Sequence, residues 1–288
     1  MTDTVLVTGA TGTVGRHVSN ELAERDYSPR VGLRDPGVVP ESLPDVADVV
    51  EFDFVRPETW GAALRGVDGL FLMRPPTVDA DTVSAFAEAA ARVGVARIAY
   101  LSTLGAERNP LIPHHRIEQR VVATDADHTL LRASFFMQNL AEVHREDIVE
   151  HDEIFVPAGT GETSFVDARD IAAVAATVLT EPGHENRSYD ITGPEALSYA
   201  DVAAVFSDVL GRRITYPEPS LVAFVRRSRG RGYPLPFIAV MCAIYTTARL
   251  GLADRVTDDT RELLGREPRR IRAFVEDYAA EFRPETAQ

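Results

Sequence analysis

The sequence contains no lysine and a single cysteine, and it has no apolar run long enough to cross a membrane. All 30 basic residues are therefore arginine, and the 44 acidic residues bring the formal net charge to -14. The lone Cys242 excludes an intrachain disulfide and a cysteine-ligated metal site. The acidity also argues against direct nucleic-acid binding, which needs a basic face. We interpret the one arginine cluster, residues 226–231, as a solvated loop, with a local contact to an anion as the alternative.

The most apolar late segment, residues 235–252, is interrupted by Pro236 and Arg249. We interpret it as a core or pocket helix because a membrane span needs about 20 consecutive apolar residues. The first residues show neither the basic region nor the apolar stretch of a signal peptide. We therefore expect a cytoplasmic protein. An acidic surface whose only cation is arginine further predicts adaptation to high salt, as in a halophile.

The opening residues carry the strongest motif. Residues 5–7 form a short apolar run typical of a buried parallel strand, and Gly9, Gly12 and Gly15 follow at three-residue spacing before a predicted helix over 14–24. The first glycine permits a tight turn, the second lets a pyrophosphate approach the backbone, and the third lets the helix pack closely on the strand. The motif predicts dinucleotide binding at the positive end of that helix.

The rest of the chain continues the alternation of strand and helix. We predict strands over 29–33, 48–53, 69–73, 96–101, 128–132 and 188–192, and helices over 57–64, 80–92, 114–123, 135–151, 168–180 and 199–210. This order predicts an α/β fold with a doubly wound parallel Rossmann sheet. We expect the cofactor domain to span 1–152 with returning segments in 164–195. A smaller, mostly helical substrate lobe would span 153–288, with tail helices near 221–227, 236–251 and 269–282.

Arg34 ends the second predicted strand, where an NAD-specific protein usually places an acidic residue on the ribose hydroxyls. A guanidinium there suits a 2′-phosphate, so we predict a preference for NADP(H), with NAD(H) as the alternative that the adjacent Asp35 leaves open. A surface Arg–Asp pair without a ligand is the structural alternative. Asp53 would accept a hydrogen bond from the adenine amino group, with Phe54 beside the ring. Met73 and Arg74 would border the nicotinamide ribose.

The Tyr-x-x-x-Lys pair of short-chain dehydrogenases is impossible here because the chain has no lysine. In its place, His114 and Glu118 stand one helical turn apart on a common face. Such a pair could orient nicotinamide or relay a proton near neutral pH, which makes His114 the candidate catalytic residue. A histidine that simply bonds Glu118 is the equally weighted structural alternative. No metal-ligand spacing occurs among the histidines, so we predict no metal.

Several segments in order resemble the NmrA-like atypical short-chain dehydrogenase/reductases. They are TGATGTVGR (8–16), LRDP (33–36), residues 114–118, LLRASFFMQN (130–139), VDARDIAAVAATVL (166–179) and YDITGPEALSYADVA (189–203). The resemblance implies a Rossmann NAD(P) domain with a small C-terminal substrate lobe. Family members are either reductases of quinones and related electrophiles or NADP(H)-binding sensors. The sequence departs from the isoflavone-reductase branch, whose catalytic lysine is missing here.

The resemblance assigns site residues by matching position. The phosphate loop would comprise Gly9, Thr11, Gly12, Val14 and Gly15, with Arg34 at the 2′-phosphate. Further cofactor contacts would be Ser102, Thr103, His114, Ser134 and Phe135. The substrate cleft would be lined by Phe136, Met137 and Asn139, with Phe135 at its edge.

From these features we predict an NADPH-dependent reductase that passes hydride to a quinone or similar planar electrophile. The alternative is a non-catalytic NADP(H) sensor, and a sugar-nucleotide epimerase is the weakest hypothesis because those enzymes also use the Tyr–Lys pair. The expected partner is a small-molecule electron acceptor. Self-association into a homo-oligomer is left open by the sequence.

Overall fold

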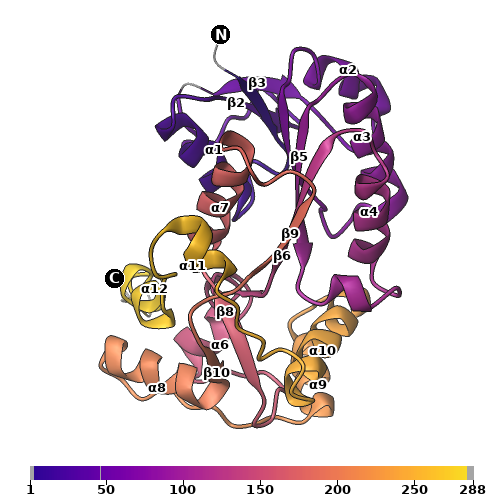
Figure 1. Ribbon diagram of the computed structural model, residues 1–288. Coiled ribbons are helices and arrows are strands. Elements are labelled where there is room, and N and C mark those ends of the chain that lie inside the picture. The colour runs from indigo at the N-terminus through magenta and orange to yellow at the C-terminus, as the bar shows by residue number, and fades with distance from the viewer. Residues whose placement is uncertain (1–2, 46, 284–288) are drawn as a thin grey trace. The chain divides into compact units, whose positions relative to one another are not determined.

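The computed structural model describes residues 3–45 and 47–283, and the chain divides into two compact units. The first unit comprises Met1–Ala133, Ala168–Ile191 and Asp259–Arg266. The second comprises Ser134–Asp167, Thr192–Asp258 and Glu267–Gln288. Figure 1 shows the elements of each unit, which are described separately below.

The first unit is built on a parallel sheet in the order β3-β2-β1-β4-β5-β6-β9, counted over the described residues. Its strands are Thr4–Val7 (β1), Ser28–Leu33 (β2), Asp48–Glu51 (β3), Gly69–Met73 (β4), Arg97–Thr103 (β5), Asp127–Ala133 (β6) and Arg187–Ile191 (β9). Its α-helices are Gly15–Glu24 (α1), Trp60–Ala63 (α2), Ala80–Arg92 (α3), Pro113–Val122 (α4), Ala168–Thr180 (α7) and Asp259–Leu264 (α11).

Helices cover both faces of this sheet, which confirms the predicted doubly wound fold. Helices α1 and α7 pack together on one face, whereas α3 and α4 pack together on the other (Figure 1). Both faces are therefore shielded from water, and the central strands are apolar throughout: Val5, Leu6 and Val7 are at most 1% exposed. This burial explains why the strands show continuous apolar runs rather than alternation.

The direction of strand addition reverses between β1 and β4. The chain builds β2 and β3 outward from one side of β1, and β4, β5, β6 and β9 outward from the other. At such a switch point the loops after the two central strands diverge, and a crevice forms at their carboxyl ends. The glycine turn after β1 and the residues after β4 therefore flank the expected ligand position.

The second unit contains a small sheet in the order β10-β8-β7, formed by Ala196–Ser198, Glu162–Val166 and Phe135–Phe136 respectively. Its helices are Asn139–Glu142 (α5), Arg145–Glu150 (α6), Tyr199–Leu210 (α8), Leu221–Gly230 (α9), Leu235–Arg249 (α10) and Ile271–Asp277 (α12). An aromatic core holds them together: Phe165, Tyr199 and Tyr245 are at most 1% exposed, and their ring centroids are 5.5 to 5.9 Å apart along the chain of contacts.

The predicted helix over 135–151 is wrong. Phe135 and Phe136 instead pair with Phe165 and Val166 of β8, and the Met137 N–H donates to the Val166 carbonyl at 2.9 Å. The aromatic pair suits a strand, and its partner lies far away in sequence, so local periodicity carried no sign of the pairing. Helical structure begins only at Asn139 and is divided between α5 and α6. Strands β8 and β10 and helix α11 were also absent from the prediction.

The observed boundaries also differ from those expected. The first unit ends at Ala133 rather than near 152, and it takes back Asp259–Arg266 from the C-terminal third of the chain. Two polar contacts bind this returning segment: the Asp190 N–H donates to Asp259 at 2.7 Å, and Arg266 pairs with the buried Asp170 at 2.8 Å. Contacts between residues so distant in sequence leave no local pattern.

Two further segments, residues 226–231 and 235–252, were expected to form a solvated loop and a core or pocket helix respectively. The arginine cluster is not a loop, because α9 runs through it to Gly230. The apolar segment forms α10, with Ile238, Met241 and Tyr245 buried. Among the described residues, no helix combines the length and the apolar character needed to cross a membrane.

Gly15→Ala should destabilise the protein by about 1–3 kcal/mol, the usual cost of forcing an extra methyl group into a filled space. A Cβ at this position would lie 2.2 Å from the Gly9 carbonyl oxygen. The matched control is Gly61→Ala in α2, where an added Cβ meets nothing within 4 Å. Thermal unfolding in high salt should show a lower Tm for the first variant only. Equal Tm values would contradict the close approach of α1 to the turn.

Candidate cofactor and active site

The end of β1 is fixed to the end of β4 by Thr8. Its N–H and its Oγ1 hydroxyl both donate to the Phe71 carbonyl at 3.0 Å, and Oγ1 accepts the Met73 N–H at 3.0 Å. Thr8 is fully buried, so these bonds are protected from water. The threonine thereby anchors the start of the glycine turn to the neighbouring strand.

The turn itself is tight because its glycines lie against one another. Gly9 adopts a φ of +64°, and its carbonyl accepts the Gly12 N–H at 2.9 Å. Added Cβ atoms would lie 2.3 Å from the Met73 sulfur at Gly9 and 2.2 Å from the Gly9 oxygen at Gly15. The two residues therefore have the roles predicted from spacing, a left-handed turn and a close helix approach.

Helix α1 starts from this turn without a side-chain cap. Its N-cap residue is Val14, no side-chain hydrogen bond caps the helix at this residue, and the first turn contains no acidic residue. The first backbone N–H groups of a helix lack intrahelical acceptors and carry partial positive charge, so they suit a phosphate. Thr11 is exposed beside them, whereas the Val14 side chain is 2% exposed and packs in the core. Only the Val14 backbone could face a ligand.

Arg34 follows directly after β2 and is exposed. It takes part in none of the ion pairs between described residues, and its neighbour Asp35 instead accepts the Gly37 N–H at 2.9 Å within its own turn. The alternative of a surface Arg34–Asp35 pair is therefore not what the structure shows. The guanidinium stands at the sheet edge with its donors available for an anion.

The residues expected around adenine divide between surface and core. Asp53 is partly exposed, and its Oδ1 accepts the Val55 N–H at 3.1 Å. Phe54 is only 4% exposed, and its ring packs edge-on against Phe52 and Phe86 with centroids 4.8 and 5.5 Å away. The Phe54 ring is thus a core residue of the first unit rather than an open stacking surface.

A neutral pair lies at the carboxyl end of β5. The buried Tyr100 hydroxyl lies 2.7 Å from Nδ1 of His114, the second residue of α4. Burial raises the pKa of Tyr100 well above its usual value and lowers the pKa of His114 to about 4, with the nearby Arg74 charge lowering the latter further. The tyrosine therefore keeps its proton, and because the described residues offer its hydroxyl no other acceptor, we assign it as the donor to Nδ1. His114 must then carry its own hydrogen on Nε2, where it can act as a donor.

A buried charged network lies next to this pair. Glu118 is 2% exposed, accepts the Ser102 hydroxyl at 2.6 Å, and binds Arg132 in a bidentate manner, with the closest contact at 2.8 Å. The predicted His114–Glu118 bond is absent, because His114 bonds Tyr100 and the Glu118 oxygens are already occupied. The Ser102 hydroxyl donates to Glu118 and the residue is buried, and its contact with nicotinamide stays a prediction. Thr103, the last residue of β5, is partly exposed.

Neither Tyr100 nor Arg132 was among the predicted site residues. A tyrosine inside the apolar run of β5 and an arginine directly after the two buried leucines of β6 are the signals that could have found them. In the register, Ser102 lies opposite Arg132 across the two strands. A polar residue at that level of both strands indicates that their side chains meet.

The remaining predicted residues lie in the second unit. The Ser134 hydroxyl oxygen is buried without a hydrogen-bond partner among the described residues, and the Phe135 ring packs on Phe165 with centroids 5.6 Å apart. Met137 is 1% exposed and belongs to the core of this unit, so it is not a surface residue of a cleft. Phe136 and Asn139 are partly exposed.

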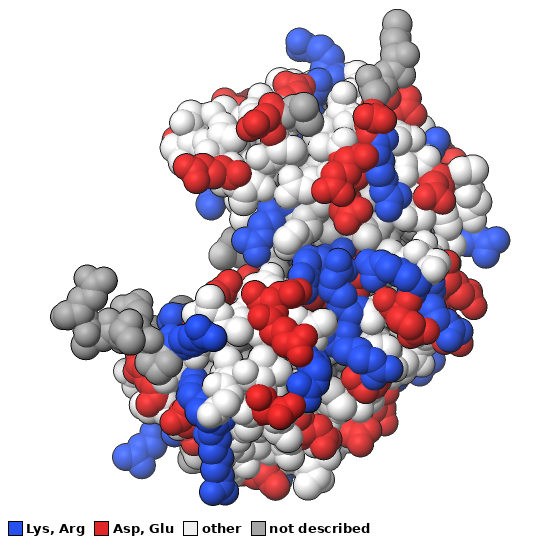
Figure 2. All heavy atoms as spheres, turned by 90° about the vertical axis from the view of Figure 1, so that its left-hand side faces the viewer, with Lys and Arg blue, Asp and Glu red and all other residues white. Residues whose placement is uncertain are grey.

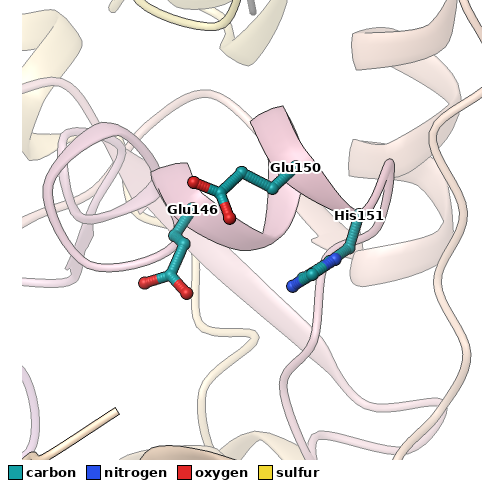
Figure 3. A group of neighbouring side chains, drawn as sticks. All are labelled: Glu146, Glu150 and His151. Atoms are coloured by element: carbon teal, nitrogen blue, oxygen red, sulfur yellow. The ribbon is translucent and has the colours of Figure 1, made fainter.

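Another group of titratable side chains lies on α6 and just after it. The Glu146, Glu150 and His151 side chains offer ligand atoms within 4.8 Å of one another, and Figure 3 shows the Glu150 side chain reaching back toward Glu146. All three are exposed, and Glu146 already pairs with Arg231 at 2.8 Å. We assign no metal to this group. Elsewhere the surface mixes charges, and Figure 2 shows arginines next to acidic side chains over the face drawn there.

A family model and a relative of known description both match most of this chain. A family model described as "NmrA-like family" matches residues 1–251. The chain is 34% identical over 283 residues to an NAD(P)H azoreductase from Xenophilus azovorans, covering 96% of this chain and 99% of the relative.

Solved structures agree with the sequence relatives. An NADPH-dependent quinone oxidoreductase from Escherichia coli, complexed with NADPH, is similar with a TM-score of 0.83 and 25% identity over 96% of this chain and 99% of that one. A triphenylmethane reductase from Citrobacter sp., complexed with NADP(H), gives a TM-score of 0.82 and 26% identity over 96% and 99% of the two chains.

Arg132→Met should cost about 3–5 kcal/mol of stability, because it leaves the buried Glu118 carboxylate without its cation. The matched control is Arg120→Met on the same helix as Glu118, whose partner Glu88 forms an ion pair at the surface. Denaturant unfolding should show a large loss for the first variant and little for the second. Similar losses would mean that the Glu118–Arg132 pair has no special role in the first unit. Adding Glu118→Gln to Arg132→Met should recover part of the loss.

Proposed function

We propose that this chain, which belongs to the NmrA-like family, transfers hydride from NADPH to a quinone or a similar planar electrophile. That the protein is an NAD(P)H-dependent oxidoreductase is supported by relatives described as an NAD(P)H azoreductase and an NADPH-dependent quinone oxidoreductase. The identity of the acceptor is the proposed part. The observation that carries it is the neutral Tyr100–His114 pair at the carboxyl edge of the sheet.

The residues around the glycine turn fit a dinucleotide. The uncapped N-terminus of α1 and the bare glycine backbone would hold the pyrophosphate, and the unpaired Arg34 would hold a 2′-phosphate. When bound, the nicotinamide supplies a hydride, and a solvent proton completes the balance: quinone, NADPH and one proton give hydroquinone and NADP⁺. The protein's own contribution is to position the two reactants and to exclude water.

His114 is the residue we place against the acceptor. Because Tyr100 donates to Nδ1, the imidazole presents an N–H at Nε2 without carrying a charge. A neutral donor stabilises the negative charge that develops on a quinone oxygen as hydride arrives, without having to transfer its own proton. The missing lysine is then no obstacle, because a quinone becomes an aromatic hydroquinone and needs no strong acid.

The alternative is an NADP(H)-binding sensor without turnover. The absence of lysine, and hence of the Tyr-x-x-x-Lys pair, favours it. NADPH oxidation measured with a panel of quinones and azo compounds in high salt separates the two. Turnover with any acceptor supports the reductase, whereas tight NADPH binding without turnover on the whole panel supports the sensor.

Arg34→Ala should weaken NADPH binding by about 1.5–3 kcal/mol, the range for hydrogen bonds to charged groups, and leave NADH binding unchanged. The reason is that only NADPH carries the 2′-phosphate that the free guanidinium would meet. Calorimetric titration with each dinucleotide measures both constants. Equal weakening for NADPH and NADH would remove Arg34 from the 2′-phosphate position.

His114→Gln should retain most of kcat/KM, since its amide N–H can replace Nε2–H, whereas His114→Leu should lose about 10²-fold, the lower range for removing one donor to a developing oxyanion. Because the pKa of His114 is lowered to about 4, the imidazole stays neutral and the His114-dependent rate should be flat from about pH 5.5 to 8. The pH profile of kcat/KM checks this. A wild-type rate that increases as pH falls through 7 to 6, and does so only when His114 is present, would instead indicate a charged imidazole acid.

A further inference from the structure

Among the described residues, Arg74 has no carboxylate partner although part of its side chain is buried. It follows the last residue of β4 and is partly buried. Its Nε is fully buried and has no hydrogen-bond partner in the described part of the chain, where its side chain makes one long hydrogen bond, from Nη2 to the Pro76 carbonyl at 3.3 Å. Arg74 joins none of the ion pairs that the structure places between described residues. The side chain therefore keeps a full positive charge with most of its donors unused.

Arg132 and Arg231, which are also partly buried, are neutralised by carboxylates. Arg132, with 16% of its side chain exposed, binds Glu118, and Arg231, with 14% exposed, binds Asp147 through two nitrogens at 2.8 Å. The chain carries 44 acidic residues against 30 arginines, so carboxylate partners are plentiful.

Arg16 near the start of α1 shares with Arg74 a buried Nε without a hydrogen-bond partner among the described residues. Withdrawing a charge from water without a partner is costly. An arginine that has both an unpartnered buried Nε and no carboxylate is therefore suited to bind an anion from outside the chain, and Arg16 lies beside the turn where we expect the cofactor pyrophosphate.

Arg74 lies near the Tyr100–His114 pair, which we place against the acceptor. Met73 pairs with Leu101 of β5 in the sheet register, so Arg74 follows beside the end of the strand that carries Tyr100. The Arg74 charge lowers the pKa of both His114 and Tyr100, reinforcing the larger effect of burial on His114 and opposing the larger effect of burial on Tyr100. The nearby Glu118 forms no ion pair with Arg74, and its charge is instead balanced by Arg132. A ligand that reaches His114 from the sheet edge would therefore meet Arg74 as well.

We propose that Arg74 binds an anionic group, a carboxylate, sulfonate or phosphate, carried by the electron acceptor beside its reducible ring. This inference rests on the proposed function and narrows its substrate class to aromatic or quinonoid acceptors with an oxyanion substituent. The pyrophosphate of the cofactor offers the same oxyanion chemistry. The glycine backbone and the uncapped α1 N-terminus already provide for that group, so we assign Arg74 to the acceptor.

The test compares two acceptors that differ in charge. The substrates are 1,4-naphthoquinone-2-sulfonate and 2-methyl-1,4-naphthoquinone, and the variants are Arg74→Met, which keeps the apolar stem, and Arg74→Lys, which keeps the charge. Dividing each variant value by the wild-type value for the same acceptor cancels the different intrinsic reactivities. Arg108→Met is the control, because Arg108 lies in the loop before α4 with 77% of its side chain exposed.

We expect Arg74→Met to raise KM for the sulfonate at least about tenfold and to leave KM for the methyl compound within about twofold, the loss of a charge-assisted hydrogen bond being at least this large. Arg74→Lys should recover part of the difference, and Arg108→Met should behave as the wild type. Equal changes for both acceptors would overturn the proposal. So would a weaker NADPH affinity in Arg74→Met with unchanged discrimination, which would assign Arg74 to the cofactor phosphates.

A binding measurement separates this proposal from the proposed function. Naphthalene-2-sulfonate, which cannot be reduced, is titrated calorimetrically into the NADP⁺-loaded protein and its Arg74→Met variant. Binding that is lost in the variant supports the Arg74 site even if neither quinone is turned over. Equal binding to both proteins, or none to the wild type, overturns it.

Discussion

The close contact between the start of α1 and the Gly9 carbonyl is the constraint on which the site depends. Gly15 can approach this oxygen only because it has no side chain, and Gly9 can turn only because it accepts a positive φ. Thr8 holds the turn against β4 with buried hydrogen bonds. The consequence is a helix N-terminus whose backbone donors are rigidly placed and uncapped at the switch point of the sheet, beside the residues that follow β4.

Two adjacent buried pairs at the carboxyl edge of the sheet differ in charge: one is an ion pair and the other is neutral. Glu118 and Arg132 keep their charges because each satisfies the other, and Ser102 fills a remaining acceptor position. Tyr100 and His114 stay neutral because burial disfavours their charged forms. The ion pair fixes the ends of β5, β6 and α4 relative to one another, and the neutral pair sets which imidazole nitrogen carries the hydrogen. In this small region the ion pair therefore positions the backbone elements, whereas the neutral pair supplies the proposed hydrogen-bond donor.

The core of the second unit also contains buried ion pairs next to a buried neutral histidine. Arg227 and Arg231 on and just after α9 converge on Asp147, whose pKa is lowered by their hydrogen bonds against the opposing effect of burial. His144, fully buried against Tyr245, has its pKa lowered to about 4 by burial, with Asp147 opposing and Arg231 reinforcing the shift. The cluster of arginines that appears solvated in the sequence is therefore partly an internal ion-pair network. Arg227 and Arg231 are partly buried where a carboxylate meets them.

The sequence by itself determined the parallel sheet, the glycine turn and the position of Arg34, because each depends on residues close together in the chain: an apolar run, a three-residue glycine spacing, and the end of a strand. Strand β4 and helices α3, α7 and α8 were predicted at the observed bounds for the same reason. Only the tertiary structure decided the partners of Ser102, His114 and Glu118, the strand at Phe135–Phe136 and the return of α11. These contacts join residues 14 to 69 positions apart, and side chains that meet only through sheet register or helix packing leave no local periodicity.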